Sequence, residues 1–270
     1  MFDYLKYLRT SNLPHIWCTG CGMGIILKAI LRAVDSLKLD KDKIAMVSGI
    51  GCSSRTPGYV DFNTLHTTHG RPLTFATGLK LARSDLNVLV VSGDGDAVAI
   101  GGNHFIHACR RNIDLTCIVY NNYIYGMTGG QTSPTTPVGF WTTTAPYGSS
   151  EPPFDISGLA IGAGATFVAR ATTYHANILD RFIKQGIEHK GFSVIEILTQ
   201  CATMFGRKNR IGDSVAILNW FKENSIPVKK ARRLSSEELK GKITVGVLQD
   251  IAKPEYIETY LRIRDRIKGG

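Results

Sequence analysis

Two segments of the sequence indicate the fold class: Asn87-Val-Leu-Val-Val-Ser-Gly-Asp-Gly-Asp96 and, further along the chain, Leu115-Thr-Cys-Ile-Val-Tyr-Asn-Asn122. Their two short apolar runs have the length and composition of strands that are buried on both faces of a parallel sheet. Residues 96–111, which lie between them, are numerous enough for a connecting helix. The block therefore predicts a β-α-β unit with Gly-Asp-Gly and Asn-Asn at the carboxyl ends of its strands, where open α/β sheets bind ligands.

The Gly93-Asp94-Gly95 turn combines features of a phosphate site with a carboxylate. Both glycines allow the backbone to turn sharply and to approach a ligand with its amide N–H groups. A bare phosphate would repel Asp94, whereas a Mg²⁺ ion between the two would bind both of them. Asn122 supplies a neutral oxygen after the next strand. Each piece alone is typical of turns and loops, but their spacing predicts a magnesium-bound phosphate compound.

Length and hydropathy point to one large α/β domain. The 270 residues are enough for a sizeable core, and no apolar run approaches membrane-spanning length. The N-terminal segment has no apolar signal core. We therefore expect no membrane association and a cytoplasmic location.

Positive charge is concentrated at the C-terminal end. The net charge is +10, and residues 207–270 contain 15 Lys and Arg against 8 Asp and Glu. No nucleic-acid recognition motif accompanies this charge, so nucleic-acid binding is not predicted. An acidic redox partner, a phosphorylated cosubstrate, an acidic neighbouring subunit or a solvated basic surface would each account for it.

Most of the cysteines stand at the ends of predicted strands or helices, where loops can bring them together. These four are Cys18, Cys21, Cys52 and Cys201. Cys109 and Cys117 instead lie inside a predicted helix and a predicted strand, and we interpret them as small buried hydrophobic residues.

The C-x-x-C pair Cys18 and Cys21 has several interpretations. Too little chain precedes it for the leading β-α-β unit of a thioredoxin-like fold, and a disulfide is not expected in a cytosolic protein. A tetrahedral thiolate site would suit zinc or an iron–sulfur cluster, and the spacing alone favours neither.

Five motifs in chain order closely resemble the β subunit of 2-oxoacid:ferredoxin oxidoreductases. They are Leu13-Pro-His-Ile-Trp-Cys-Thr-Gly-Cys-Gly22, Gly49-Ile-Gly-Cys-Ser-Ser54, Leu65-His-Thr-Thr-His-Gly-Arg71, Ser92-Gly-Asp-Gly-Asp96 and Tyr120-Asn-Asn-Tyr-Ile-Tyr-Gly-Met-Thr-Gly-Gly-Gln131. Two later blocks, 146–155 and 200–206, look most like the 2-oxoglutarate-specific branch. The resemblance runs from about residue 13 to 210. Thr19 and Ala202 stand where proline is expected, but neither change removes a ligand.

The resemblance implies three cofactors, namely thiamine diphosphate (ThDP), Mg²⁺ and a [4Fe–4S] cluster. The implied Mg²⁺ ligands are the side chains of Asp94 and Asn122 and the carbonyl of Ile124, and the cluster ligands are Cys18, Cys21, Cys52 and Cys201. The implied cofactor contacts are Ile50, Gly51, Cys52, Ser53, His69, Gly93, Gly95, Asp96, Gly126, Met127 and Thr128. Of the two histidines near Arg71, His69 is favoured over His66, and Met127 should lie beside the reactive ring.

The fold implied is the diphosphate-binding type of the ThDP fold, a mostly parallel sheet with helices on both faces. It would occupy residues 1–210, with residues 211–270 as a basic extension packed on it or on a partner subunit. This half of the cofactor site lacks the carboxylate that activates ThDP. The resemblance therefore implies an α subunit with the pyrimidine-binding domain and that carboxylate, together with ferredoxin, coenzyme A and a 2-oxoacid.

The expected activity is oxidative decarboxylation of 2-oxoglutarate with coenzyme A, or the reverse reductive carboxylation of succinyl-CoA. The alternatives are a subunit acting on pyruvate or a branched-chain 2-oxoacid, half of a non-oxidative decarboxylase, and a zinc-stapled assembly protein without activity. Cys201 argues against the decarboxylase, which has no use for four assembled thiolates.

Arg55 is the candidate for substrate selection. A 2-oxoglutarate enzyme must hold a distal carboxylate that pyruvate lacks, and a guanidinium group is suited to this. Arg55 follows the proposed cluster ligand Cys52 by three residues, in a loop expected to border the thiazolium ring. A surface cation or a contact to the α subunit is the alternative interpretation.

Overall fold

Eight strands of the computed structural model, which describes residues 2–268, form one sheet in the order β2-β1-β3-β4-β8-β7-β10-β9. The strands are β1 (Ile44–Ser48), β2 (Asn63–His66), β3 (Asn87–Gly93), β4 (Leu115–Asn121), β7 (Phe167–Thr172), β8 (Phe192–Leu198), β9 (Ser225–Pro227) and β10 (Ile243–Asp250). Neighbours are parallel except β10 and β7, which are antiparallel. A separate ribbon consists of β5 (Ile124–Tyr125) and β6 (Gln131–Thr132).

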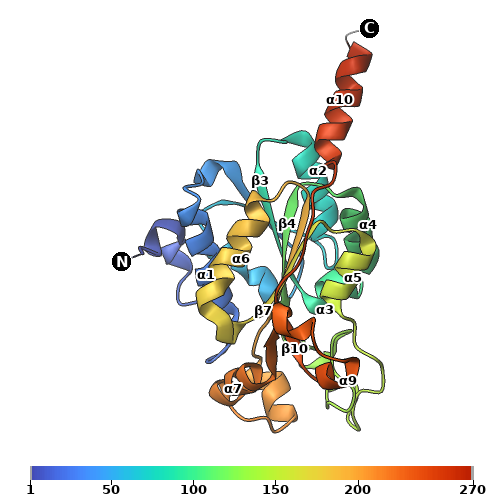
Figure 1. Cartoon of the computed structure of the whole chain (residues 1–270). Helices are drawn as coiled ribbons and strands as arrows, with labels where there is room; N and C mark the ends of the chain where they lie inside the picture. Colours follow the sequence, from blue (N-terminus) through green and yellow to red (C-terminus); the bar gives the residue numbers. More distant parts are fainter. Residues whose placement is uncertain (1, 269–270) are drawn as a thin grey trace.

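Helices cover both faces of this sheet, as the sequence predicts. Figure 1 shows one layer of helices on each side of the strands. The helices are α1 (Met23–Ser36) and α6 (Ala176–Glu188) on one face, and α2 (Pro72–Ala82), α4 (Gly102–Arg111) and α5 (Ile156–Ala163) on the other. Each layer encloses its own cluster of buried apolar side chains against the sheet. The fold class is therefore confirmed.

The predicted β-α-β unit forms, with one correction in its connection. Both strands are present, and Cys109 and Cys117 are fully buried as predicted. The prediction of one connecting helix over residues 96–111 is wrong, because the segment divides into α3 (Asp94–Val98) and α4. The break contains Gly101, where a Cβ atom would lie 2.2 Å from the backbone oxygen of Asp96. This close approach of two backbone segments does not fit a continuous helix.

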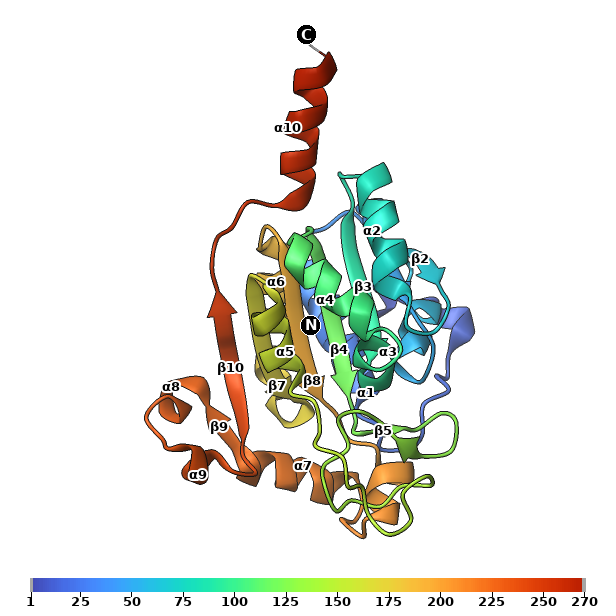
Figure 2. The same cartoon turned by 90° about the vertical axis from the view of Figure 1, so that its right-hand side faces the viewer.

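The C-terminal segment extends the sheet and then leaves it. It contains α7 (Ser214–Asn224), α8 (Val228–Ala231), α9 (Ser236–Leu239) and α10 (Tyr256–Lys268) in addition to β9 and β10. Figure 2 shows β10 running along the sheet and α10 projecting from its end. A buried contact anchors the start of α10, since the backbone N–H of Asp114 donates to Glu255 at 2.9 Å. The domain division at residue 210 stays a prediction.

Short helical turns complete the fold. The 3₁₀ turns are Leu5–Tyr7, Thr10–Asn12, Lys41–Lys43, Ser53–Gly58 and Thr173–His175, and a π turn spans Ala202–Gly206. Within residues 2–268, no helix combines the length and the apolar character needed to cross a membrane.

Candidate active site

A cavity of about 180 Å³ lies at the carboxyl edge of the sheet, around the ends of β3 and β4. Every residue that the sequence assigned to ThDP or Mg²⁺ lines it, and so do Met23, Tyr120 and Tyr125. The structure thus brings together segments that lie far apart in the chain, from Met23 to Thr128. Their individual roles stay predictions.

Asp94 is buried at the start of α3 and is held by hydroxyl groups from a distant loop. The hydroxyls of Ser133 and Thr135 each donate to Oδ2 of Asp94 at 2.6 Å. Burial raises the pKa of this carboxyl group, and the two hydroxyl contacts oppose that shift. Among residues 2–268, no side chain donates a hydrogen bond to Oδ1 of Asp94. The two hydroxyl groups therefore hold Oδ2, and a nearby cation would favour the charged form of the carboxylate.

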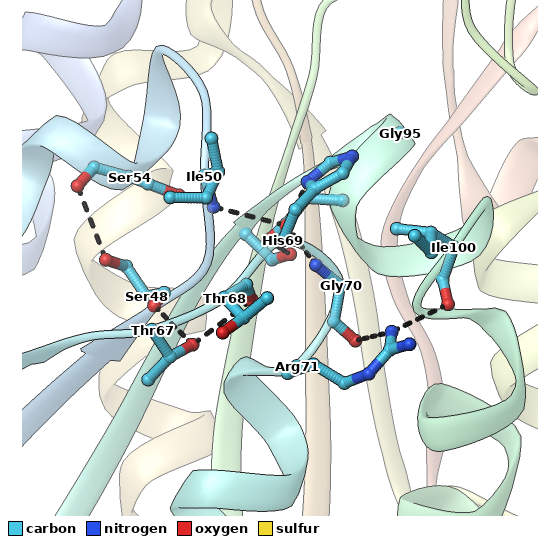
Figure 3. Close-up of polar contacts among 12 residues, drawn as sticks. Ser48, Ile50, Ser54, Thr67, Thr68, His69, Gly70, Arg71, Gly95 and Ile100 are labelled. Atoms are coloured by element: carbon cyan, nitrogen blue, oxygen red, sulfur yellow. Dashed lines mark hydrogen bonds and ion pairs between the residues drawn. The ribbon is translucent and has the colours of Figure 1, made fainter.

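The side chain of Asp96 joins two loops of the site to the end of β3. Figure 3 shows Ile50, His69 and Gly70, which belong to these two loops. Oδ1 of Asp96 accepts hydrogen bonds from the backbone N–H groups of Ile50 at 3.2 Å and Gly70 at 2.7 Å. Its Oδ2 accepts from the hydroxyl of Ser92 at 2.6 Å. The carboxylate is 2% exposed, so these contacts satisfy it without water. The sequence assigned only the backbone of Asp96 a role.

Asp96 also orients His69. Nδ1 of His69 lies 2.7 Å from Oδ1 of Asp96, so the carboxylate accepts the Nδ1–H proton and Nε2 remains available to a ligand. His69 lines the cavity, and its ring lies edge-on to Tyr125. His66 lies elsewhere, with its Nδ1 3.0 Å from the Ser48 hydroxyl. His69 and not His66 therefore lines this cavity, and the role of His69 stays a prediction.

Two glycines are required by close contacts. A Cβ atom on Gly49 would lie 2.2 Å from a carboxylate oxygen of Asp96, and one on Gly95 would lie 2.2 Å from the ring of Tyr125. The Tyr125 hydroxyl also donates to the backbone oxygen of Gly95 at 3.2 Å. Any larger residue at either position would displace the cavity wall.

A buried polar network supports the asparagine pair. The hydroxyl of Thr135 lies 3.0 Å from Oδ1 of Asn121, and Nδ2 of Asn121 donates to Glu196 at 2.9 Å. Glu196 in turn pairs with Arg170 at 2.8 Å. This network leaves Asn122, the next residue, at the cavity with Ile124, whose backbone N–H donates to Oδ1 of Asn122 at 3.3 Å.

The four cysteines predicted to bind the cluster line a second cavity of about 290 Å³. They are Cys18, Cys21, Cys52 and Cys201. The indole N–H of Trp17 donates to the backbone oxygen of Cys52 at 2.8 Å, which joins two of these loops. Gly22 packs against the side chain of Gln200, next to Cys201, where a Cβ would lie 2.2 Å away. Loops from three parts of the chain therefore converge.

Burial favours the protonated form of three of these thiols, Cys21, Cys52 and Cys201, in the absence of a metal. It raises the pKa of Cys21 to about 12 and that of Cys52 to about 11. The pKa of Cys201 is also raised, mainly by burial. A bound cation would reverse this, because the thiolate is the ligand form. Within residues 2–268, no three His, Cys, Asp or Glu side chains are placed to share one metal ion.

Arg55 occupies the border of the site and does not line the first cavity. Its guanidinium is exposed, and Nη2 lies 3.8 Å from the sulfur of Met127, which lines both cavities. Arg55 lines a separate cavity of about 180 Å³ together with Arg9 and His66. Its proposed contact with substrate stays a prediction.

Comparison with known proteins identifies the family. Residues 49–197 match the family described as thiamine pyrophosphate enzyme, C-terminal TPP binding domain. The chain is 55% identical over 268 residues to the 2-oxoglutarate synthase subunit KorB of Methanocaldococcus jannaschii, with 99% of each chain covered. This chain belongs to the KorB family of 2-oxoglutarate synthase subunits. The predicted family, fold and oxidoreductase class are thereby confirmed.

Two further relatives are similar to this chain over nearly its whole length. The KorB subunit of Archaeoglobus fulgidus is 50% identical over 268 residues, which cover 99% of this chain and 97% of the relative. A solved 2-oxoglutarate:ferredoxin oxidoreductase from Magnetococcus marinus, with 2-oxoglutarate, coenzyme A and succinyl-CoA bound, superposes with a TM-score of 0.88. It is 35% identical, with 100% of this chain and 92% of that chain covered.

Several contacts of this KorB-family site are not evident from its motifs. Ser133 and Thr135 follow the glycine-rich segment, and only the fold shows that they return to Asp94. In the sequence, the polar pair Ser133-x-Thr135 is the one feature that could have indicated this contact. Glu196 and Arg170 lie in strands and look like ordinary alternating residues. Their buried pairing depends on the neighbouring positions of β7 and β8.

Replacement of Gly49 by alanine tests the Asp96 junction. The added methyl group cannot fit 2.2 Å from the carboxylate, so it should cost about 1–3 kcal/mol of stability and lower ThDP affinity. Gly58→Ala is the matched control, because a Cβ there meets no atom within 4 Å. Thermal unfolding of the assembled enzyme measures both. Equal midpoints for the two variants would refute the close contact.

Proposed function

We propose that this KorB-family chain binds ThDP and Mg²⁺ in the first cavity and a [4Fe–4S] cluster in the second. One observation carries the proposal, which is that the two cavities share a wall. The residues common to both are Met23, Cys52, Asn122, Gly126 and Met127. When bound, ThDP supplies an electron sink for decarboxylation of a 2-oxoacid, and the cluster supplies a one-electron acceptor next to it.

The first cavity offers the ligands that Mg²⁺ prefers. Asp94, the side chain of Asn122 and the backbone carbonyl of Ile124 are hard oxygen donors on its wall. The Ser133 and Thr135 hydroxyls hold Asp94 through Oδ2, which leaves Oδ1 for the cation. The remaining contacts proposed for ThDP are backbone and side-chain groups of Ile50, Gly51, Cys52, Ser53, His69, Gly93, Gly95, Asp96, Gly126, Met127 and Thr128.

The second cavity fits an iron–sulfur cluster better than a single zinc ion. Four thiols line about 290 Å³, and within residues 2–268 they do not converge closely enough to share one ion. A tetrahedral zinc site requires four ligands at about 2.3 Å from one point. A cubane cluster separates its four cysteine ligands more widely, as the cavity requires.

We assign the substrate end of the site to His69, Met127 and Arg55. Nε2 of His69 faces the cavity because Asp96 holds Nδ1, so it can bind a cofactor oxygen. Met127 forms the wall between the two cavities and packs beside the reacting atoms. Arg55, in contact with Met127, binds the distal carboxylate of 2-oxoglutarate.

The complete enzyme needs partners. An α subunit supplies the pyrimidine-binding domain and the activating carboxylate, and the names of the relatives already describe KorB as one subunit of several. The substrates are 2-oxoglutarate and coenzyme A, in either direction of the reaction, and ferredoxin takes or gives the electrons. The solved relative has the first two bound and is named for the third. A cytoplasmic location is part of the proposal.

Loss of a Mg²⁺ ligand should abolish Mg²⁺-dependent ThDP binding. Asp94→Ala and Asn122→Ala each remove an oxygen from a cation that tolerates little departure from octahedral geometry. Calorimetric titration of the assembled enzyme measures the affinity. Asn103→Ala, on the exposed side of α4, serves as the control. Affinity like that of the wild type in Asp94→Ala would disprove the assignment.

The cysteines form two groups with opposite expectations. Alanine at Cys18, Cys21, Cys52 or Cys201 should lose or degrade the cluster. Alanine at the buried Cys109 or Cys117 should keep the cluster and reduce only packing stability. Anaerobic absorbance, EPR, and iron and sulfide analysis distinguish the groups. An unchanged cluster in Cys201→Ala, or a colourless zinc-containing protein, would overturn the four-ligand proposal.

Substrate choice tests Arg55. Loss of a charge-assisted contact should cost about 1.5–3 kcal/mol, or about 10- to 150-fold in kcat/KM for 2-oxoglutarate. Steady-state kinetics of Arg55→Ala should show little change with pyruvate, which has no distal carboxylate. Arg55→Lys keeps the charge and should recover part of the loss. Equal losses for both substrates would assign Arg55 a role in holding the loop.

A further inference from the structure

Three cations follow the last proposed cluster ligand and form what we term the cluster rim, namely Arg207, Lys208 and Arg210. They come directly after the π turn Ala202–Gly206 that begins beside Cys201. Arg207 and Arg210 are exposed, and Lys208 is half-buried. None of the three pairs with a carboxylate within residues 2–268. Their charge is therefore available to a partner.

The cluster rim is held against a second loop. The backbone N–H of Trp141 donates to Oδ1 of Asn209 at 2.6 Å, and Nδ2 of Asn209 donates to the Trp141 carbonyl at 3.1 Å. Phe140 stacks on Phe205 with the ring centres 5.1 Å apart. These contacts leave a hollow of about 440 Å³, which Lys208, Arg210 and the half-exposed Trp141 line. The positive charges thus surround an aromatic, concave surface.

The thiol cavity is lined in part by exposed side chains, and its lining extends to Met204, three residues before the rim. Ile16 lines the cavity and is 69% exposed, and Cys18 is exposed as well. The hydroxyl of Ser214, at the start of α7, donates to the backbone oxygen of Gly20 at 2.7 Å. This contact joins the C-x-x-C loop to the segment directly after the cluster rim. Figure 1 places α7 at the end of the molecule opposite α10.

We propose that the cluster rim, with the exposed Ile16 and Trp141, is the docking surface for a small electron-transfer protein whose own surface is acidic. This inference rests on the proposed cluster. Electron transfer requires the carrier to approach the cluster closely. The rim cations, which pair with no carboxylate within residues 2–268, come directly after the π turn that lines the thiol cavity. Such charge attracts and orients an acidic carrier, while the exposed apolar side chains give a small, transient contact.

Charge reversal on the assembled enzyme tests the proposal. The variant Lys208→Glu with Arg210→Glu is compared with Lys229→Glu plus Lys230→Glu, which makes the same change of charge on α8. The reaction with 2-oxoglutarate and coenzyme A is followed with a purified acidic ferredoxin and, separately, with methyl viologen. A small dye needs no protein docking surface, so its reduction reports on the cofactors alone.

The rim variant should lose about 10-fold or more of its second-order rate constant for ferredoxin at low salt, and its salt dependence should flatten. Its viologen activity and the ferredoxin rate of the α8 variant should stay unchanged. Binding of the same ferredoxin, measured by calorimetry without turnover, should weaken in the rim variant only.

Several outcomes would overturn the docking surface. Unchanged ferredoxin kinetics in the rim variant, or equal losses of the ferredoxin rate constant in both variants, would show that the rim does not bind the carrier. Separation of the α subunit from the rim variant on size exclusion would mark this face as a subunit contact. In each of these cases an active viologen reaction leaves the proposed function intact. Loss of viologen reduction by the wild type would refute the proposed function itself.

Discussion

The buried carboxylate of Asp96 is the contact on which the site depends. It binds the backbone N–H groups of Ile50 and Gly70, the hydroxyl of Ser92 and the ring of His69, and so joins two loops to the end of β3 at the carboxyl edge of the sheet. A carboxylate suits this position because it is an acceptor among hydrogen-bond donors, and the Asp96 side chain is itself buried. These hydrogen bonds hold the loops of the cofactor cavity in position against the β-α-β unit that contains Asp96.

The two cavities lie side by side because single residues belong to both. Cys52 is a proposed cluster ligand and also lines the ThDP cavity, and Met127 separates the two spaces. The proposed sites of ThDP and of the cluster are therefore adjacent in this structure. The rigid network from Asp94 through Thr135 and Asn121 keeps the cation side of the cavity fixed by buried hydrogen bonds.

Acidic and basic side chains near the two cavities differ in their exposure to solvent. Asp94 and Asp96 are buried inside the site, whereas the cations of the cluster rim, which pair with no carboxylate within residues 2–268, follow the proposed cluster ligand Cys201 in the chain. The C-terminal segment therefore has two separate parts. Its first residues form the cluster rim beside the thiols, while β10 closes one side of the sheet and α10 projects from the opposite end of the molecule. The net charge alone does not distinguish these parts.

The sequence alone predicts the strands of the β-α-β unit, the burial of Cys109 and Cys117, and the motif residues and four thiols that line the two cavities, although it misses other lining residues such as Met23 and Tyr120. These depend on short apolar runs and on motifs that are read within a few residues. The folded structure is needed to see that the helix after Gly95 is broken, that the Asp96 side chain joins two loops to the end of β3, and that Ser133 and Thr135 hold Asp94. It also decided that β10 joins the sheet antiparallel to β7. Each of these features is a close approach between segments distant in the chain. No local pattern encodes such an approach, because it exists only when packing brings the two backbones together.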